Sequence, residues 1–418
     1  MSQTSARTRV LVDPARELEG RVLPGAGLTV AERMAVEAAV PELKPRVREI
    51  VDVARAILDE EGVDALSMRA IAARLGVRAP SLYKHLPDKQ AILDVLVADI
   101  LRENGDVMRD AIREAEDPVG SIFDAFRAWA LENPQRYEVC MSGRLDESPL
   151  VRSASLYSGD PLRWVMRDDL EGAITFWAFA HGLVDLEIRG RLPQVYDADL
   201  VWQWGVAQLR HRDDVVASPD PLGASTSTVG FRSGIPDAQP LSERAERIVE
   251  VARELMEEEG AEAMSMRNIA ARLGVRAPSL YKHLPDKKAL EDAIIVSVLR
   301  EQGAIGRRVT AEARAAGEDP LLAIVEAYRV WALDHPDLYR LNMRGRLDRG
   351  PLTRQAEVES AQPLFEAADG SGVAAVATWA FAHGCVDLEL NDRIPPGYAL
   401  GVVRRRGVAA LRPGGARS

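Results

Sequence analysis

The chain has 418 residues, of which 47% are hydrophobic and 28% charged, so it has the composition of a globular protein long enough for two or three domains. Its formal net charge of −11 argues against a protein that binds nucleic acid over its whole surface. No uninterrupted apolar run reaches the roughly 18 residues that a membrane-spanning helix needs, and the N-terminus lacks the apolar core of a signal peptide.

The first 44 residues have no counterpart later in the chain. They mix both signs of charge with several prolines and glycines, and we expect a mostly loose extension with one short helix around residues 29–39. The two cysteines, Cys140 and Cys385, do not match each other in the repeat described next, which argues against a shared metal site or a symmetric disulfide. This use of cysteine fits a reducing cytoplasm.

One segment of nineteen residues occurs twice. It runs from Ile71 to Lys89 and returns unchanged from Ile269 to Lys287, 198 positions later. Solenoid repeats have periods of only about 20–50 residues, so this offset predicts two large copies of one module. Residues 213–240 between the copies are rich in serine, proline, glycine and aspartate, which is typical of a linker.

Each copy begins with apolar residues at helical spacing, between Ile50 and Leu58 and again between Ile248 and Met256. Gly62 and the matching glycine of the second copy are natural stops for these helices. No run of residues bounded by turn residues alternates strictly between apolar and polar, so no strand is predicted. We therefore predict an all-α chain.

A second helix and a short third helix are expected to follow. Ser67 is a good N-cap for the second helix, and Gly76 supplies the positive φ that a tight corner between helices needs. Pro80 suits the first turn of the third helix, which we place over Ser81–Leu86. Leu82 and Leu86 lie four residues apart and should face inward, which turns the polar and aromatic residues between them outward.

Helix, glycine turn and short exposed helix form a helix-turn-helix pattern, in which the second element of the pair enters the DNA major groove. Arg78 is placed to read guanine, whereas Tyr83, Lys84 and Lys89 are placed to contact phosphates. From Ser67 to Lys89 five basic residues stand against one acidic residue, and the second copy has the same balance. A generic three-helix corner with solvated charges is the alternative. The predicted DNA-binding residues are Ser67, Arg69, Arg78, Ala79, Pro80, Ser81, Tyr83, Lys84, His85 and Lys89, and Ser265, Arg267, Arg276, Ala277, Pro278, Ser279, Tyr281, Lys282, His283 and Lys287.

The segment from about Val47 to Leu93 resembles the N-terminal DNA-binding domain of the TetR family of transcriptional repressors. In that family a tyrosine, an aromatic or apolar residue three positions later and a lysine mark the end of the recognition helix and the start of the fourth helix. Here these residues are Tyr83, Leu86 and Lys89, and the second copy repeats them as Tyr281, Leu284 and Lys287. Leucine replaces the phenylalanine that is commoner in the family.

The C-terminal halves of the copies also match, at an offset of 202. Trp177–Gly182 and Trp379–Gly384 have the same sequence, Trp-Ala-Phe-Ala-His-Gly, and Val-Asp-Leu-Glu follows two residues after each glycine. This pattern is similar to the regulatory domain of a subset of TetR-like proteins. The resemblance implies a helical domain that binds a small effector and forms the dimer interface.

Trp177, His181 and Asp185 are spaced four residues apart and so share one helix face. They are candidates to line an effector pocket, and the alternative is a structural or interface role. His181 with Asp185 is also the best candidate catalytic pair, but no nucleophile motif accompanies it and no metal-ligand spacing or phosphate loop is present, so we expect no enzyme, no metal and no cofactor. The candidate effector residues are Trp129, Tyr137, Met141, Arg144, Trp177, His181 and Asp185, and Trp331, Tyr339, Met343, Arg346, Trp379, His383 and Asp387.

The expected organisation is therefore two tandem modules packed as an intramolecular pseudo-dimer, cytoplasmic and without a membrane partner. Identical recognition positions predict an operator with two matching inverted half-sites. We expect a repressor that a small effector releases, with an activator or a regulator without effector as the alternative; pairing of two chains is left open. The expected segments are an extension (1–44), DNA-binding domains (45–93 and 241–291), regulatory domains (94–212 and 292–411), the linker (213–240) and a tail (412–418).

Overall fold

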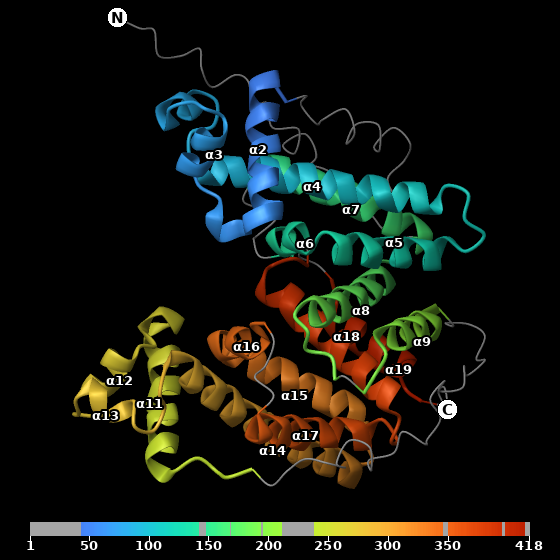
Figure 1. Cartoon of the computed structure of the whole chain (residues 1–418). Coiled ribbons are helices and arrows are strands. Elements are labelled where there is room, and N and C mark those ends of the chain that lie inside the picture. The colour runs from blue at the N-terminus through green and yellow to red at the C-terminus, as the bar shows by residue number, and fades with distance from the viewer. Residues whose placement is uncertain are drawn as a thin grey trace, which may run out of the picture. The chain divides into compact units, whose positions relative to one another are not determined.

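The computed structural model describes residues 43–141, 148–167, 169–193, 195–210, 238–345, 350–394 and 398–413. These residues form helices joined by turns and contain no strand, which confirms the all-α prediction (Figure 1). The helix expected around residues 29–39, most of the expected linker, and the candidate effector residues Arg144 and Arg346 lie outside the described residues.

The chain divides into two compact units, and the boundary falls inside one helix. The first unit runs to Ala173 and also contains residues 391–398. The second unit comprises Ile174–Leu390 and continues from Ala399. The last helices of the first copy therefore belong in space to the same unit as the second copy.

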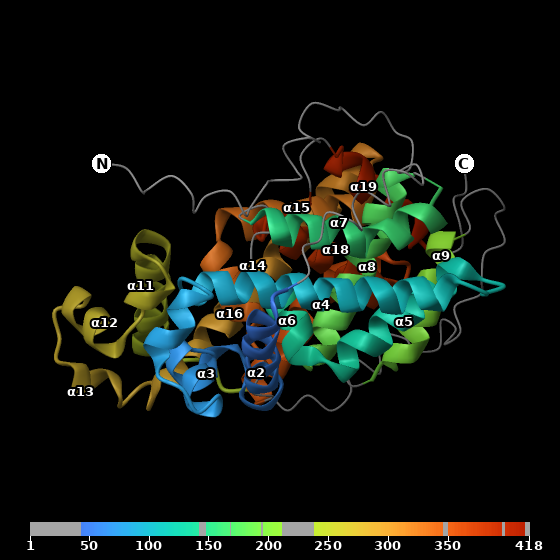
Figure 2. The ribbon, with the colours of Figure 1, turned by 90° about the horizontal axis from the view of Figure 1, so that it is seen from above.

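The first unit carries a helix-turn-helix domain followed by a helical bundle. α4 packs along α5 and α7, and α2 packs on α3 and α4 (Figure 2). Its helices are α2 (Pro45–Glu61), η1 (Val63–Ala65), α3 (Met68–Arg74), η2 (Ala79–Lys84), α4 (Lys89–Ile112), α5 (Pro118–Glu132), α6 (Pro134–Met141) and α7 (Pro149–Val165), and the next helix, α8 (Leu170–Ile188), begins in it.

The second unit repeats this arrangement and adds the last two helices of the first copy. α14 packs along α15 and α17, and α18 contacts α9, α15, α17 and α19. Its further helices are α9 (Ala198–Arg210), α11 (Glu243–Glu259), η3 (Ala261–Ala263), α12 (Met266–Arg272), α13 (Ala277–Leu280), α14 (Lys287–Ala316), α15 (Pro320–Asp334), α16 (Pro336–Met343), α17 (Pro351–Ala367), α18 (Gly372–Leu390) and α19 (Leu400–Ala410).

Local sequence explains most helix ends. Gly62 and Gly260 end the first helix of each copy at φ of 83° and 87°, a conformation that favours glycine. Asp88 caps α4 by accepting a hydrogen bond from the amide of Ala91 at 2.8 Å. The four extra residues of the second copy lie in a longer helix, since α14 has 30 residues and α4 has 24.

α18 is long and apolar enough to cross a membrane by length and composition alone, but 78% of its most apolar window is buried in the fold. It is therefore a core helix of this unit. Both cysteines are free and buried, and burial raises the pKa of each thiol to about 12, which keeps it protonated.

Candidate nucleic-acid interface and regulatory core

The recognition element is set by short-range contacts that both copies repeat. Ser67 caps α3 by accepting a hydrogen bond from the amide of Ala70 at 3.1 Å, and Ser265 caps α12 in the same way through Asn268 at 3.2 Å. Gly76 turns the chain at φ of 65°. The third helix begins two residues earlier than predicted. It is a 3₁₀-helix of six residues over Ala79–Lys84 in the first copy and a shorter α-helical turn of four residues over Ala277–Leu280 in the second.

The leucines of this element are buried and its polar residues face outward, as the spacing predicted. Leu82 is 0% and Leu86 6% exposed, whereas the Tyr83 side chain is 50% exposed. The predicted DNA-binding residues that are exposed are Arg69, Arg78, Pro80, Tyr83, Lys84, His85, Lys89, Arg267, Arg276, Pro278, Tyr281, Lys282, His283 and Lys287; those that are half-buried are Ser67, Ala79, Ser81, Ser265, Ala277 and Ser279.

Not every basic residue of this segment is available to DNA. Arg74 donates hydrogen bonds to Glu60 and Glu61 of α2 at 2.6 Å each, and Arg272 is held by Glu258 and Glu259. These arginines therefore fix the corner between the first two helices of each domain. The exposed cations that remain in the first copy are Arg69, Arg78, Lys84 and Lys89, none of which forms an ion pair with another residue in the described ranges.

Helices α8 and α18 cross at two glycines, one from each copy. A Cβ atom on Gly182 would lie 1.9 Å from the carbonyl oxygen of Ala380, and one on Gly384 would lie 1.8 Å from the carbonyl oxygen of Ala178. Real Cβ atoms do not approach backbone oxygens this closely, so only glycine permits the contact. The contact is reciprocal, as expected for matching surfaces related by an approximate two-fold axis.

Two histidine–aspartate pairs flank this crossing. His181 Nε2 lies 2.9 Å from Asp387 Oδ2, and His383 Nε2 lies 2.9 Å from Asp185 Oδ2. Both histidines are fully buried. The shared face that the sequence predicted for Trp177, His181 and Asp185 therefore pairs, through its histidine and aspartate, with the same residues of the other copy.

The Asp185 carboxylate orients a chain of hydrogen bonds. Burial by itself would raise its pKa, but the hydrogen bond from His383 and the charges of His383 and Arg189 outweigh burial and hold the pKa of Asp185 well below its usual range. Burial raises the pKa of Tyr339 well above its usual value, so this phenol keeps its proton. Ionised Asp185 accepts a hydrogen bond from His383 Nε2, and the Tyr339 hydroxyl lies 2.7 Å from His383 Nδ1.

We expect Asp185→Asn to lower the free energy of unfolding by about 2 kcal/mol at pH 7, because a buried charge-assisted hydrogen bond is lost. The folded-state pKa of this carboxyl is depressed, so its contribution is present above about pH 4 and is lost as the pH falls below that value. Urea unfolding at pH 7 and at steps toward pH 2 should show the two proteins converge.

Asp387→Asn is the matched control, since the Asp387 side chain is 21% exposed and that of Asp185 only 6%. The Asp387 variant should lose less stability at pH 7. Equal stability of the Asp185 variant and the parent over the whole pH range would contradict the assigned hydrogen bond.

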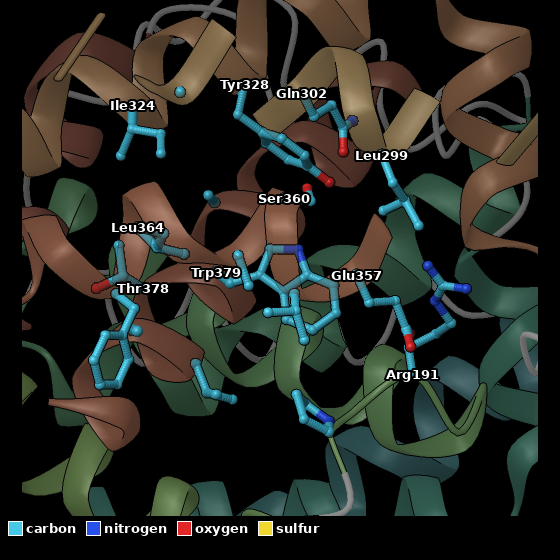
Figure 3. Close-up of a pocket in the computed structure, with 18 of the residues that line it drawn as sticks. Arg191, Leu299, Gln302, Ile324, Tyr328, Glu357, Ser360, Leu364, Thr378 and Trp379 are labelled. Carbon is cyan, nitrogen blue, oxygen red and sulfur yellow. The ribbon is translucent and has the colours of Figure 1, made fainter. Parts of the chain in front are cut away.

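A cavity of about 460 Å³ lies among α14, α15, α17 and α18, and its wall is completed by Arg191, Pro193, Val195 and Tyr196. Figure 3 shows Gln302, Tyr328 and Ser360 above Trp379, with the apolar side chains of Ile324 and Leu364 to the left of these polar groups. Its volume is in the range of small-molecule sites in proteins.

The structure separates the candidate effector residues into groups. Trp331, Met343 and Trp379 line the cavity, whereas His181, Asp185, His383 and Asp387 pair across α8 and α18, and Tyr339 contacts His383. In the first copy Trp129 donates to Glu103 at 3.1 Å, Tyr137 is buried, Met141 contacts Arg393, and Trp177 is half-buried.

Sequence reasoning did not single out several cavity residues, among them Arg191, Gln302, Tyr328 and Thr378. A comparison of the two copies could have found Tyr328 and Thr378. Each carries a hydroxyl group where the first copy has a phenylalanine, Phe126 and Phe176.

Two family models each match the chain twice. The one described as bacterial regulatory proteins of the tetR family matches residues 50–96 and 248–294. The one described as a tetracyclin repressor-like C-terminal domain matches residues 119–209 and 321–411. Each copy thus contains both domains in the same order.

Curated relatives match single parts of the chain. An HTH-type transcriptional regulator of Mycobacterium tuberculosis is 30% identical over 191 residues, which are 43% of this chain and 86% of the relative. An HTH-type transcriptional regulator of Bacillus subtilis is 35% identical over 24% of this chain and 55% of its own length. The class D tetracycline repressor protein of Escherichia coli is 38% identical over 16% of this chain and 30% of its own length.

Proposed function

The chain belongs to the TetR family of helix-turn-helix transcriptional regulators, and from this premise we propose that it represses transcription as a single-chain pseudo-dimer on an inverted-repeat operator and is released by a small effector. A second recognition element is normally supplied by a second subunit. Here the same chain carries two elements of identical sequence, at Ile71–Lys89 and Ile269–Lys287.

The observation that carries the proposal is the reciprocal crossing of α8 and α18. Gly182 and Gly384 each approach the backbone of the other helix, and two His–Asp pairs repeat the same contact in both directions. Two copies of one helix that meet through self-complementary residues form the kind of interface that builds symmetric dimers. Because both copies belong to one chain, their effective concentration is of the order of millimolar and assembly does not depend on protein concentration.

Repression would follow from occupation of a promoter by both recognition elements. The repressor role is supported by the match to the tetracycline repressor proteins and by the exposed cations of the recognition element. Release requires that an effector binds more tightly to the form that does not bind DNA. The volume and the lining of the cavity beside α18 suit such a molecule.

Selection of bound sequences from a random DNA pool tests the operator proposal. We expect enrichment of two equal inverted half-sites whose centres lie roughly one helical turn apart. Arg276→Ala is the matched variant, because it changes one recognition element only. It should leave one half-site intact and relax the guanine preference in the other, at a cost of about 1–3 kcal/mol.

An asymmetric site or no enrichment for the parent chain would contradict the proposal. The mass of the complex, measured by sedimentation, should correspond to one chain per operator. A reporter gene behind the selected site should be expressed more strongly when the regulator is deleted, and weaker expression would indicate an activator.

A further inference from the structure

The cavity of the second copy has a wall that the first copy provides. Arg191 is 6% exposed and donates to Asn342 Oδ1 at 3.3 Å. Tyr196 lies against the start of α18, where a Cβ atom on Gly372 would be 2.1 Å from its hydroxyl oxygen. Glycine at position 372 is therefore required for this arm, formed by Arg191, Pro193, Val195 and Tyr196, to close the cavity.

The first copy lacks the glycine that this contact with the arm requires. Leu170 stands at the position that matches Gly372, so a side chain occupies the place that the tyrosine of the arm uses in the second copy. In the arm that follows α18, Arg393 stands at the position of Arg191 and contacts Met141 of the first copy.

Three other cavity positions also carry smaller side chains in the second copy than in the first. Where Gly306, Val325 and Thr378 line the cavity of the second copy, the first copy has Met108, Phe123 and Phe176, and all three of these are buried. Interiors are close-packed, so larger side chains at matching positions of one fold leave less free space. The exchange is not uniform, because on α17 Glu357 replaces Ser155 and adds a polar group to the rim.

The chemistry of the wall indicates the class of ligand. Trp331, Trp379 and Tyr328 supply apolar and aromatic surface. Two arginines, Arg191 and Arg354, stand against one glutamate in the lining. The amide nitrogens of Gln302 and Asn342, the indole nitrogen of Trp331 and the hydroxyl of Thr378 are buried and have no hydrogen-bond partner in the part of the chain that the structure describes. The wall thus combines aromatic surface, positive charge and hydrogen-bond donors that lack acceptors.

We propose that the chain binds one effector molecule, in the second copy only, and that this effector is a largely apolar aromatic compound bearing an anionic group with acceptor oxygens, such as a carboxylate or sulfonate. The inference rests on the proposed function in that it names the ligand of the effector-responsive regulator. The first copy then acts as DNA-binding partner and as the source of the arm that closes the site. An occupied site would couple both copies directly, because the ligand would touch the arm of the first copy and α14–α18 of the second copy at once.

The probe for a direct test is 8-anilinonaphthalene-1-sulfonate, an aromatic sulfonate whose fluorescence rises in apolar sites. Titrated into the full chain without DNA, it should bind with a stoichiometry of one and quench tryptophan emission, since Trp331 and Trp379 line the cavity. Two sites of equal affinity, or no saturable site, would overturn the proposal.

Two pairs of variants locate the site. Val325→Phe with Thr378→Phe copies the side chains of the first copy into the second, and should weaken probe binding at least about tenfold. The mirror variant, Phe123→Val with Phe176→Thr, should leave the affinity of the existing site within about twofold. Circular dichroism and thermal unfolding check that each variant is folded. If the variant with Val325→Phe and Thr378→Phe is unfolded, the location of the site is tested by the second pair, Arg191→Gln and Arg393→Gln.

Arg191→Gln should weaken binding of the sulfonate about tenfold, because a charge-assisted hydrogen bond is lost, whereas Arg393→Gln in the other arm should change it less than twofold. Equal effects of the two variants would overturn the assignment to the second copy. Probe binding is measured without DNA and does not depend on the operator. If the operator selection fails but the variants still change probe binding as expected, only the proposed regulation is contradicted. If operator binding is intact but the variants do not change probe binding as expected, only this inference is contradicted.

Discussion

Replacement of both Tyr83 and Tyr281 by alanine is expected to weaken operator binding about 100-fold without loss of helix content. The two side chains are 50% and 47% exposed, so their removal opens no cavity in the core. We predict that each donates its hydroxyl to a DNA phosphate, so a contact worth about 1–1.5 kcal/mol would be lost at both half-sites. Fluorescence anisotropy with a labelled operator measures the affinity, and circular dichroism measures the helix content.

The two single variants are the internal control, since both elements have the same sequence. Each should lose about tenfold in affinity, and the losses should add in the double variant, as expected for distant sites. Trp164→Ala is the matched surface control, because Trp164 is 51% exposed but lies on α7, outside the recognition element. Unchanged operator binding by the double variant would contradict our placement of the DNA-reading surface.

Replacement of Gly182 and Gly384 by alanine is expected to disrupt the crossing of α8 and α18. Each new methyl group would meet a backbone carbonyl oxygen at less than 2 Å, which no side-chain rotation can relieve. Overpacked interiors typically lose about 1–3 kcal/mol per site, and a clash with backbone lies at the upper end or beyond, so we expect a loss of about 3 kcal/mol or more for each substitution. Thermal and urea unfolding measure the effect, and operator affinity should fall with it.

Gly159→Ala is the matched control for these substitutions. Gly159 is also a helical glycine, in α7, but nothing lies within 4 Å of the position its Cβ would occupy. Alanine there should stabilise the protein by about 0.5–1 kcal/mol, since it restricts the unfolded chain and suits a helix. If alanine at positions 182 and 384 had the same mild effect, the close approach of the two helices would be wrong.

Features that depend on neighbouring residues were predictable from the sequence. The N-cap Ser67, the turn at Gly76 and the start of α4 after Asp88 all depend on side chains within a few positions, and the structure has them where they were expected. The exact extent of the third helix was wrong. Its residues form tight 3₁₀ or single-turn geometry, and helical spacing alone does not distinguish this from a longer α-helix.

The regulatory core was harder to predict because its partners are far apart in the chain. Periodicity placed His181 and Asp185 on one helix face, but Asp387 is 206 residues from His181 and His383 is 198 residues from Asp185. A helix face indicates which residues point together and says nothing of which helix they meet. The cavity was missed for a similar reason, since its wall joins Arg191 of one copy to Asn342 of the other.

The crossing at Gly182 and Gly384 has a genetic consequence. In a homodimer one codon specifies both sides of a two-fold contact, so any mutation there is applied twice and the two sides remain identical. In this chain the two sides are encoded separately, and a mutation changes one of them only. Leu183 and Cys385, the residues next to the two glycines, have already diverged although both are buried. Two copies in one chain thus lift the constraint of symmetry from this contact and leave each half free to diverge.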